Sequence, residues 1–361
     1  MKRIIFTVTN DLSYDQRMNK ICTSLAQNSF DVLLVGFKKK ASLPLQPKPF
    51  KQKRLFHFFE KGFLHFAEAN LRLFFFLLFK KCDIICADDL DTALPVFFAT
   101  GIRNKQRVYD AHELFCEMHD IVTRPRIHAF WKRIEKFVQP KFALGYAANA
   151  DYARLYETMY PVHYFTLVNC PLLINEPVDI NKQKNILIYQ GAIERGRGFE
   201  QLIPAMKNLD VQLLVCGMGK CVDEMLQLAA GEDVVHKINF AGFVAPEDLP
   251  AYTRSAAIGM NVNDGFGASF YYSLTNRFFD YMHAGIPQIA NNNPENRRIN
   301  NEFEIAVLID DLQPGTIANA INLLLNDKDL YSRLQQNCLK AREVYNWQNE
   351  EKKLVGFYKS L

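Results

Sequence analysis

Several common signatures are missing from the chain, and each absence removes a class of protein from consideration. No Gly-x-Gly-x-x-Gly turn follows the first apolar run, which argues against a nicotinamide-dependent dehydrogenase. The eight cysteines form neither a Cys-x-x-Cys pair nor a zinc spacing, so no metal site is expected. No low-complexity tract occurs, and a net charge of +4 gives no reason to expect a nucleic-acid partner.

The beginning of the chain also lacks the pattern of a secretory signal. Lys2-Arg3 precedes only a strand-length apolar run, residues 4–8. Several cysteines lie within apolar runs, as reduced core cysteines do. We therefore expect a protein of the reducing cytoplasm.

What is present indicates two α/β domains. The chain has 361 residues, of which 49% are hydrophobic, and this is enough for two full cores. Apolar runs at 4–8 and 31–36 flank an amphipathic segment at 16–27. This is the strand–helix–strand pattern of a doubly wound parallel sheet, and a second one begins at 185–191.

The most informative stretch is 273–287. Apolar side chains recur there at helical spacing, with capping hydroxyls at the start and Gly285 at the end. The N-terminal turn carries Asn276 and Arg277, and a helix N-terminus attracts anions. Asp280, one turn further on, can accept two sugar hydroxyls, so the helix could hold a nucleotide. The alternative is a core helix with a solvated Asp and Arg.

The sequence Ser-Leu-Thr-Asn-Arg-Phe-Phe-Asp-Tyr-Met-His-Ala-Gly-Ile-Pro of this stretch resembles the donor-site helix of glycosyltransferase family 4. The resemblance implies a GT-B fold, in which two doubly wound Rossmann-like domains face each other across a cleft. It also implies that Asp280, which stands where the family usually has glutamate, binds the donor ribose. The family's first glutamate, which touches the transferred sugar, falls on Tyr272, and this is a departure from the pattern.

A loop rich in glycine and arginine follows the first strand of the second domain. Glycines let the backbone approach a ligand and arginines can clamp a diphosphate, although an ordinary strand-to-helix loop is the alternative. Family 4 has Gly-Arg followed by Lys-Gly here, so the resemblance implies donor-diphosphate binding by Gly191 and by Arg197-Gly198. The family's first arginine falls on Ala192, and Arg195 is the nearby cation that can substitute for it.

Two further turns complete the expected donor site. The strand at 211–216 ends in Gly217. The resemblance places the nucleobase against the loop that holds Phe243 and Val244. We therefore expect a UDP- or GDP-sugar donor, with no other cofactor and no metal.

In the first domain, His112 and Glu113 follow a strand at 107–110, and ligands of open α/β sheets bind outside the carboxyl ends of strands. The surrounding Tyr-Asp-Ala-His-Glu-Leu resembles the family's histidine loop, in which the histidine faces the transferred sugar. His112 is therefore the expected catalytic residue. A capped turn is the alternative explanation for a lone His-Glu pair.

Residues that face the acceptor are expected on neighbouring loops of the first domain. Asp15 and Arg17 belong to an Asp-Gln-Arg sequence that resembles the family's N-terminal motif. The alternative for them is a helix-start Asp followed by a solvated Arg. The full acceptor-side set is Asn10, Asp11, Asp15, Arg17, Asp88, Asp89 and Glu113.

The segment 55–79 consists largely of Phe, Leu and Ala. On a helix, its polar residues fall in one narrow stripe: His57, Glu60, Lys61, His65, Glu68 and Arg72. Two hypotheses follow. The first, which we favour, is a helix buried in the core of the first domain, because a surface helix usually buries only one face. The second is a helix lying on an anionic membrane, with the cations of 51–81 at the headgroups.

The resemblance covers nearly the whole chain and implies an acceptor-side domain at 1–178 and a donor domain at 185–340. A polar linker at 175–184 joins them, and a helix at 341–361 crosses back to the first domain. The implied reaction transfers a sugar, with retention of configuration, to a hydroxyl of a glycan or lipid-linked acceptor, as in polysaccharide biosynthesis. Two alternatives stay open: a catalytically silent GT-B protein that binds nucleotide or glycan, and a nucleotide-sugar epimerase.

Overall fold

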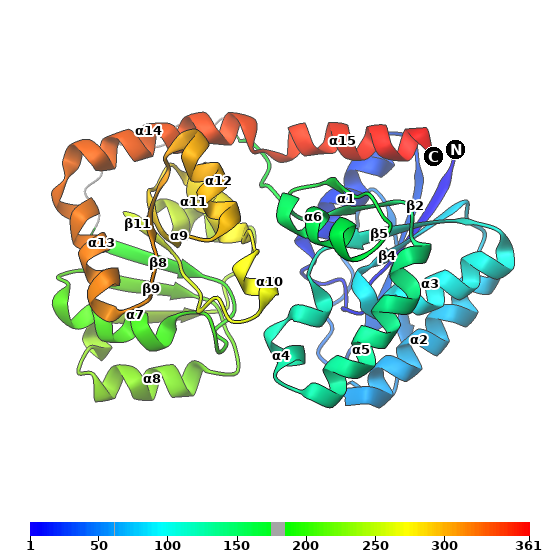
Figure 1. Ribbon diagram of the computed structural model, residues 1–361, viewed down its shortest axis with the longest axis horizontal. Coiled ribbons are helices and arrows are strands. Elements are labelled where there is room, and N and C mark those ends of the chain that lie inside the picture. Colours follow the sequence, from blue (N-terminus) through cyan, green and yellow to red (C-terminus); the bar gives the residue numbers. More distant parts are fainter. Residues whose placement is uncertain (61, 175–184) are drawn as a thin grey trace. The chain divides into compact units, whose positions relative to one another are not determined.

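The computed structural model describes residues 1–60, 62–174 and 185–361. The chain divides into two compact units, each with its own parallel sheet (Figure 1). Unit 1 consists of Met1–Asn169 with Glu350–Leu361, and unit 2 is Cys170–Asn349. The expected linker at 175–184 and the polar-stripe residue Lys61 lie outside the described residues.

Unit 1 is built on a seven-stranded sheet in the order β3-β2-β1-β4-β5-β6-β7, and all neighbouring strands are parallel. Its strands are β1 (Arg3–Thr7), β2 (Asp31–Lys38), β3 (Lys51–Phe56), β4 (Ile84–Asp88), β5 (Gln106–Ala111), β6 (Gly145–Ala147) and β7 (Phe165–Thr166). Ile4, Ile5 and Phe6 of β1 are fully buried, as expected for a central parallel strand that is covered on both faces. The strand order reverses between β1 and β4, which is where an open α/β sheet binds its ligands.

Helices cover both faces of the unit 1 sheet. They are α1 (Gln16–Gln27), α2 (Gly62–Phe79), α3 (Asp89–Arg103), α4 (His119–Val122), α5 (Pro125–Val138), α6 (Ala150–Met159) and the part of α15 (Trp347–Ser360) from Glu350 onward. Figure 1 shows α2, α3 and α5 on one face and α1 and α15 on the other. The buried ring of Tyr358 in α15 packs against Phe6 of β1, with ring centroids 5.8 Å apart, so the last helix belongs to this core.

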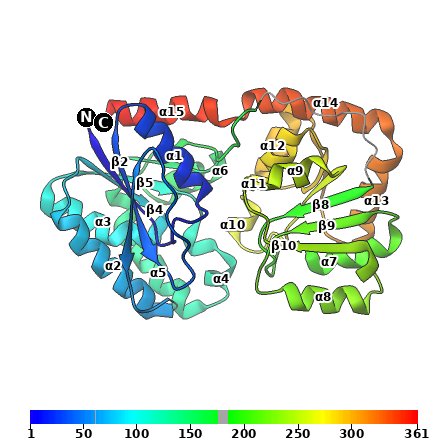
Figure 2. The same cartoon turned by 180° about the vertical axis from the view of Figure 1, so that it is seen from behind.

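Unit 2 contains a six-stranded parallel sheet in the order β10-β9-β8-β11-β12-β13 (Figure 2). Its strands are β8 (Ile186–Gln190), β9 (Gln212–Cys216), β10 (Ile238–Gly242), β11 (Ile258–Asn261), β12 (Gln288–Asn291) and β13 (Ala306–Ile309). Its helices are α7 (Phe199–Ala205), α8 (Val222–Gly231), α9 (Leu249–Arg254), α10 (Ala268–Tyr271), α11 (Asn276–Ala284), α12 (Pro294–Phe303), α13 (Pro314–Asn326) and α14 (Lys328–Val344). Here the order reverses between β8 and β11.

These two sheets confirm the expected fold class of two Rossmann-like α/β units. The helix that the sequence predicts within 273–287 is confirmed as α11, which spans Asn276–Ala284. The hydroxyl of Thr275 accepts a hydrogen bond from the Phe278 N–H and caps its start. Gly285 ends it in the left-handed conformation, with φ of 64°. All eight cysteines are buried free thiols, as expected of core residues.

The favoured prediction for 55–79 is wrong in two respects. The helix begins only at Gly62, since Leu55 and Phe56 belong to β3, and it is not sunk in the core. Only His65, Ala69, Leu73 and Leu77 of α2 are buried, and they form one stripe at four-residue spacing. The opposite face is exposed. Periodicity could not identify the buried face, since apolar side chains occur all round this helix.

Candidate donor and acceptor sites

The expected donor residues of unit 2 gather at the carboxyl ends of β8 and β11. Gly191 follows β8, and the first turn of α11 lies beside the end of β11. The hydroxyl of Thr275 donates to the Asn261 side chain at that end, with an O···O distance of 2.7 Å. This is the point at which the strand order reverses, so the fold provides a ligand site here.

Arg277 is the buried centre of this site, with only 5% of its surface exposed. Its guanidinium donates to the Asn261 side chain, the Tyr189 hydroxyl and the Val262 carbonyl, at 3.0, 3.2 and 3.1 Å. It also lies 4.7 Å from the centroid of the Tyr189 ring. No ion pair among the described residues involves Arg277. Buried charges are normally paired, so an unpaired guanidinium at a ligand-binding edge favours an anionic ligand.

The arginine also adjoins the loop after β8. A Cβ atom placed on Gly191 would lie 3.4 Å from Nη1 of Arg277. Three of the five guanidinium N–H groups are used in the contacts above, which leaves two for a further acceptor. Arg277 therefore brings a positive charge close to Gly191 and the loop after β8.

Asp280 lies one turn into α11 and is held by the end of β8. The side-chain amide of Gln190 donates from Nε2 to one Asp280 oxygen at 2.7 Å. Its Oε1 accepts a hydrogen bond from the Thr253 hydroxyl at 2.8 Å. Asp280 is partly exposed, whereas Gln190 is buried. The carboxylate is therefore oriented by a buried network and remains near the surface, where a ligand can reach it.

Close backbone packing explains the glycines of the site. A Cβ atom on Gly217 would lie 1.8 Å from the Gly191 carbonyl oxygen, so this glycine lets the loops after β8 and β9 approach each other. Gly198 precedes α7 with φ of 79°, a left-handed conformation that favours glycine. Both positions are therefore required by the loop geometry.

The remaining donor-side residues occupy varied positions. Nη2 of Arg195 donates to both carboxylate oxygens of Glu224 in α8, at 2.9 and 3.0 Å, so this cation is engaged in an ion pair within unit 2. The guanidinium of Arg197 lies 4.8 Å from the centroid of the Phe270 ring in α10. The other four residues lie in turns or at helix ends and are partly or largely exposed: Phe243, Val244, Tyr272 and Asn276.

In unit 1, His112 lies at the carboxyl end of β5, beside Asp88 and Asp89 at the end of β4. Oδ1 of Asp89 accepts the backbone N–H groups of His112 and Glu113, at 2.9 and 3.0 Å. Asp89 holds a left-handed backbone with φ of 56°, an uncommon conformation for this residue type. Oδ1 of Asp88 is buried without a hydrogen-bond partner among the described residues.

Burial sets the protonation states of this cluster. It lowers the pKa of His112 to about 3, and the charges of Arg17 and Lys20 act in the same direction. Burial raises the pKa of both Asp88 and Asp89 well above the ordinary range, and neighbouring carboxylates add to the shift. The imidazole is therefore neutral at physiological pH, so one ring nitrogen can donate a hydrogen bond and the other can accept one.

The same three side chains are a possible donor set for a divalent cation. Their ligand atoms all lie within 4.8 Å of one another. Two carboxylates and a neutral imidazole suit such an ion. However, Oδ1 of Asp89 already accepts two backbone N–H groups. The expectation of a metal-free site stays a prediction.

Most of the other acceptor-side residues build the loops of unit 1. Asp15 caps α1 by accepting the Met18 N–H at 2.8 Å, and it also accepts from the Asn10 amide at 2.6 Å. Asp11 accepts from the backbone and hydroxyl of Ser13. These contacts fix the turn after β1.

Arg17 is a buried cross-link in unit 1. It forms a bidentate ion pair with Asp110 of β5, with N···O distances of 2.7 and 3.1 Å, and also donates to the Leu167 carbonyl at 3.2 Å. Arg17 is 3% exposed and Asp110 is fully buried. The alternative of a solvated Arg17 is therefore wrong.

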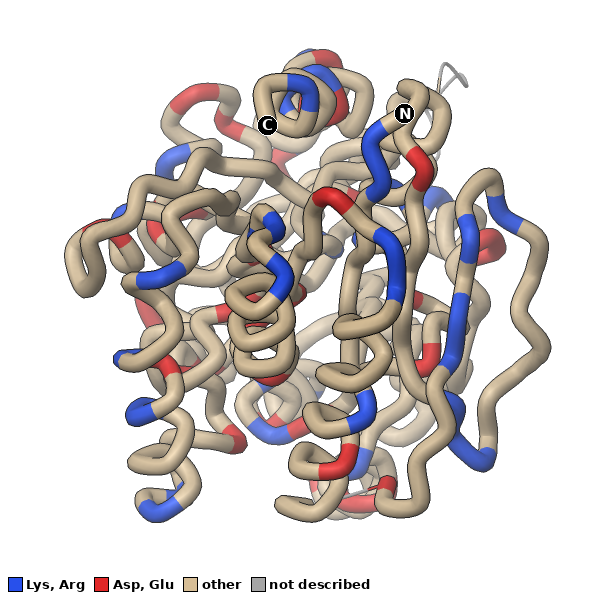
Figure 3. The backbone as a smooth tube through the Cα atoms, turned by 90° about the vertical axis from the view of Figure 1, so that its right-hand side faces the viewer, with Lys and Arg blue, Asp and Glu red and all other residues tan. Residues whose placement is uncertain are grey.

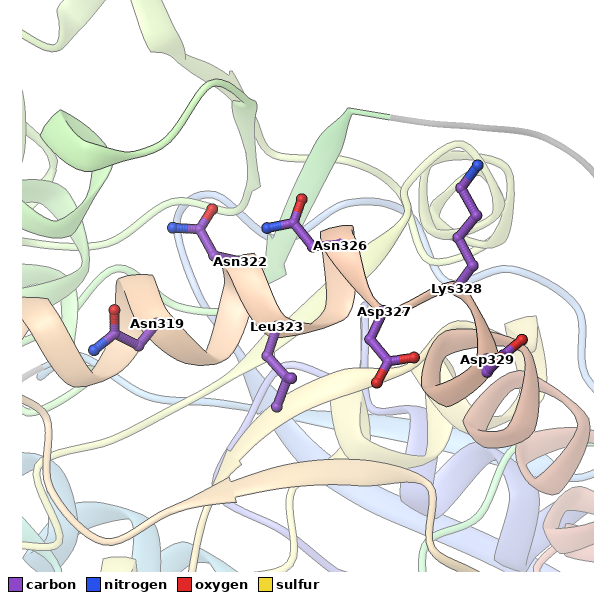
Figure 4. A pocket seen from close by; sticks show the side chains of 7 residues that line it. All are labelled: Asn319, Asn322, Leu323, Asn326, Asp327, Lys328 and Asp329. Atoms are coloured by element: carbon purple, nitrogen blue, oxygen red, sulfur yellow. The ribbon is translucent and has the colours of Figure 1, made fainter.

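A surface pocket of about 730 Å³ lies elsewhere in unit 2, at the junction of α13 and α14. In Figure 4, Asn322 and Asn326 point to one side of the helix, and Leu323 and Asp327 point to the other. Its polar groups do not converge, so it is not a second site.

Sequence reasoning missed four residues that organise these sites: Tyr189, Gln190, Asn261 and Asp110. Tyr189 and Gln190 end an apolar strand and looked like part of its core. Asp110 lies next to the last residue of β5, two positions before His112, and this place near the carboxyl end of a strand is the one signal in the sequence. The partner of each lies between 16 and 93 residues away in sequence.

The whole chain has the GT-B fold of known glycosyltransferases. Sucrose-phosphate synthase from Thermosynechococcus elongatus superposes with a TM-score of 0.82, at 16% identity, covering 100% of this chain and 99% of that one. HepE from Anabaena, in complex with UDP-glucose, superposes with a TM-score of 0.77, at 14% identity and 100% coverage of both chains. At these identities the comparison establishes the fold.

The family is indicated by sequence. Residues 173–341, nearly all of unit 2, match the family described as Glycosyl transferases group 1. An uncharacterized glycosyltransferase of Methanocaldococcus jannaschii is 24% identical over 189 residues, which are 50% of this chain and 46% of that protein. A probable sucrose-phosphate synthase of Oryza sativa is 30% identical over 99 residues, 27% of this chain and 9% of that protein. The chain thus spans less than half the length of these relatives.

Proposed function

We propose that the protein is a retaining glycosyltransferase of family 4 type, which transfers a sugar from a nucleotide sugar to a hydroxyl acceptor in the cytoplasm. The observation that carries the proposal is the buried Arg277, which has no carboxylate partner among the described residues and adjoins Gly191 where the sheet binds ligands. A diphosphate supplies the missing negative charge, and Asp280 is oriented to accept ribose hydroxyls. HepE, which shares the fold, binds UDP-glucose, so a UDP-sugar is the first donor to test.

The reaction itself would rest on positioning and charge. Arg277 and the N-terminus of α11 would stabilise the leaving diphosphate, assisted by Arg197. His112 would contact the transferred sugar as a neutral imidazole. A glycan or a lipid-linked glycan is the proposed acceptor. Calorimetric titration with UDP, GDP and ADP identifies the base, and product analysis with UDP-sugars tests transfer and configuration.

Removing the ribose-binding carboxylate should weaken nucleotide binding. Asp280→Ala is expected to reduce the affinity for UDP by about 1.5–3 kcal/mol, the range for hydrogen bonds to a charged group. Asp280→Asn should lose nearly as much affinity. The asparagine has the size of the aspartate and can still contact Gln190, but it lacks the negative charge. Calorimetry should show the loss with uridine as well as UDP. Unchanged uridine affinity in both variants would remove Asp280 from the ribose site.

His112→Ala should reduce sugar transfer by about 100-fold or more, the usual scale for a group positioned at the reacting centre. UDP affinity should stay near that of the wild type, because the donor nucleotide is held by unit 2. The wild-type rate should show no inflection near pH 6.5, since the pKa of His112 is lowered to about 3. A pH–rate profile measures this directly, and an inflection near 6.5 would mean that His112 is more solvated than in the structure.

A catalytically silent nucleotide-binding protein is the second candidate, and Tyr272 favours it. The side chain stands where the family's first glutamate touches the sugar, and it packs on Tyr271 with ring centroids 4.8 Å apart. A silent protein would bind UDP with the same dependence on Asp280 and Arg277 but would neither transfer nor hydrolyse any sugar of a UDP-, GDP- and ADP-sugar panel. Conversion of the donor sugar without transfer would instead identify an epimerase.

A further inference from the structure

The outward face of α2 is apolar along its whole length. Exposed residues recur every four positions, in the stripe Phe63, Ala67, Leu71, Phe75 and Phe79. Phe63 is 66% exposed and Phe79 is 84% exposed. A helix that packs only within its own domain carries charged residues on its outer face. The outer face of α2 therefore has the composition of a contact surface.

Two neighbouring helices extend this surface. Exposed apolar side chains also occur on α3 and α5: Phe98, Ile102, Ile127, Phe130 and Phe137. Ring contacts join the three helices. The ring centroids of Phe63 in α2 and Phe130 in α5 are 5.7 Å apart, and those of Phe98 in α3 and Phe137 in α5 are 6.4 Å apart. We call this set of exposed residues on α2, α3 and α5 the apolar face. Contiguous exposed apolar surface of this kind usually marks an interaction site.

The exposed charges of α5, which borders the apolar face, are basic. Between Pro125 and Lys141 there are five basic residues and one acid, Glu135, which is buried in an ion pair with Lys132. Arg126, Arg133 and Lys136 on α5 are all exposed. Figure 3, which faces unit 1, shows whole helical turns without a charged residue and blue segments beside them.

The two charged residues of α2 are occupied within unit 1. Arg72 pairs with Glu68 at 2.7 Å, and Glu68 accepts the N–H groups of Phe58 and Phe59 at 2.8 and 3.1 Å. The Glu68 carboxylate therefore holds the backbone of residues 58–59, which precede α2. The apolar face is thus bordered by Arg126, Arg133 and Lys136 of α5, for which the described residues supply no ion-pair partner.

We infer that the apolar face docks unit 1 on the surface of an anionic lipid bilayer. Exposed aromatic and aliphatic side chains enter the interface between headgroups and acyl chains, and nearby Lys and Arg contact anionic headgroups. This surface belongs to unit 1 alone and does not depend on the proposed sugar transfer.

The helix lies on the bilayer and does not cross it. By length and composition alone, Gly62–Phe79 would suffice to span a membrane. However, α2 connects β3 to β4, and both strands are hydrogen-bonded in the same sheet. Its buried stripe, which includes Leu73 and Leu77, packs within unit 1. Insertion across a bilayer would remove this stripe from the core and break the crossover.

The basic residues of β3 are not part of the surface. Lys51 pairs with Asp31 at 2.7 Å, and Lys53 is exposed on the edge strand of the sheet. Lysines on an edge strand prevent pairing with other chains, which accounts for both without a membrane. The cations expected to contact anionic headgroups are therefore those of α5, and not Lys51 and Lys53 of β3.

Vesicle co-sedimentation of the full chain tests the inference. The protein should bind phosphatidylcholine vesicles that contain phosphatidylglycerol, and binding should fall as salt is raised. Leu71→Gln with Phe75→Gln should reduce binding about tenfold or more, because two exposed apolar side chains are lost. Arg133→Gln with Lys136→Gln should reduce it about fivefold for each cation removed.

The matched control is Leu226→Gln with Leu323→Gln, which removes two exposed leucines of unit 2 and should leave binding unchanged. Unaltered thermal unfolding of each variant shows that the fold is intact. Equal binding to pure phosphatidylcholine, equal loss in the control, or no sedimentation at low salt would each overturn the inference. Concentration-dependent dimerisation that Leu71→Gln with Phe75→Gln abolishes, without vesicle binding, would assign the apolar face to a second copy of the chain instead.

Discussion

Arg277→Met is expected to weaken UDP binding by about 2–5 kcal/mol, the usual cost of truncating one partner of a buried, hydrogen-bonded charge pair. Arg277 is 5% exposed and has no carboxylate partner among the described residues, so a bound diphosphate would be its counter-ion. Uridine lacks the phosphates and should bind the variant nearly as well as the wild type. Calorimetric titration with both ligands separates loss of the charge from loss of the site.

Arg277→Lys refines this test. A lysine keeps the positive charge but cannot contact the Asn261 side chain, the Tyr189 hydroxyl and the Val262 carbonyl at once, as the forked guanidinium does. UDP affinity should therefore fall to a value between those of the wild type and Arg277→Met. The control is Arg333→Met, which removes an exposed arginine of α14 paired with Glu304 and should not change UDP affinity.

If Arg277→Met binds UDP as the wild type does, the diphosphate is held by the loop after β8, and Arg197 becomes the principal cation. Loss of affinity in Arg195→Met would show that Arg195 leaves Glu224 when the nucleotide binds.

The position of α11 could be predicted from the sequence because its determinants are local. Thr275 caps the helix, the apolar spacing sets its buried face, and Gly285 ends it, all within eleven residues. The contacts of Arg277 could not be predicted in the same way. Its partners come from β8 and from the end of β11, and the partner of Asp280 is Gln190, 90 residues away.

The failure at α2 has a different cause. A hydrophobic pattern identifies the buried face of a helix by contrast with a polar face. In α2 the buried stripe of His65, Ala69, Leu73 and Leu77 is no more apolar than the exposed one. The sequence therefore predicts a helix but not its orientation, and the surrounding sheet decides which stripe is covered.

The largest stability effect is expected at the buried pair of Arg17 and Asp110 in unit 1. Arg17→Met should lower the free energy of unfolding of unit 1 by about 3–5 kcal/mol, because it leaves the Asp110 carboxylate buried without a counter-ion. Replacing both partners, in Arg17→Met with Asp110→Leu, should recover most of the loss, since an apolar pair leaves no buried charge. Breaking the exposed pair of Arg333 and Glu304 should cost at most about 1 kcal/mol.

Tryptophan fluorescence can follow this unfolding in unit 1 alone. The chain has two tryptophans, of which Trp131 is in unit 1 and Trp347 is in unit 2, so a Trp347→Phe background isolates the signal. Urea titration of the single and double variants then gives the coupling between Arg17 and Asp110. If the double variant regains stability and sugar transfer, Arg17 is purely structural. If it regains stability but not transfer, Arg17 also acts on the acceptor side, as the Asp-Gln-Arg resemblance implies.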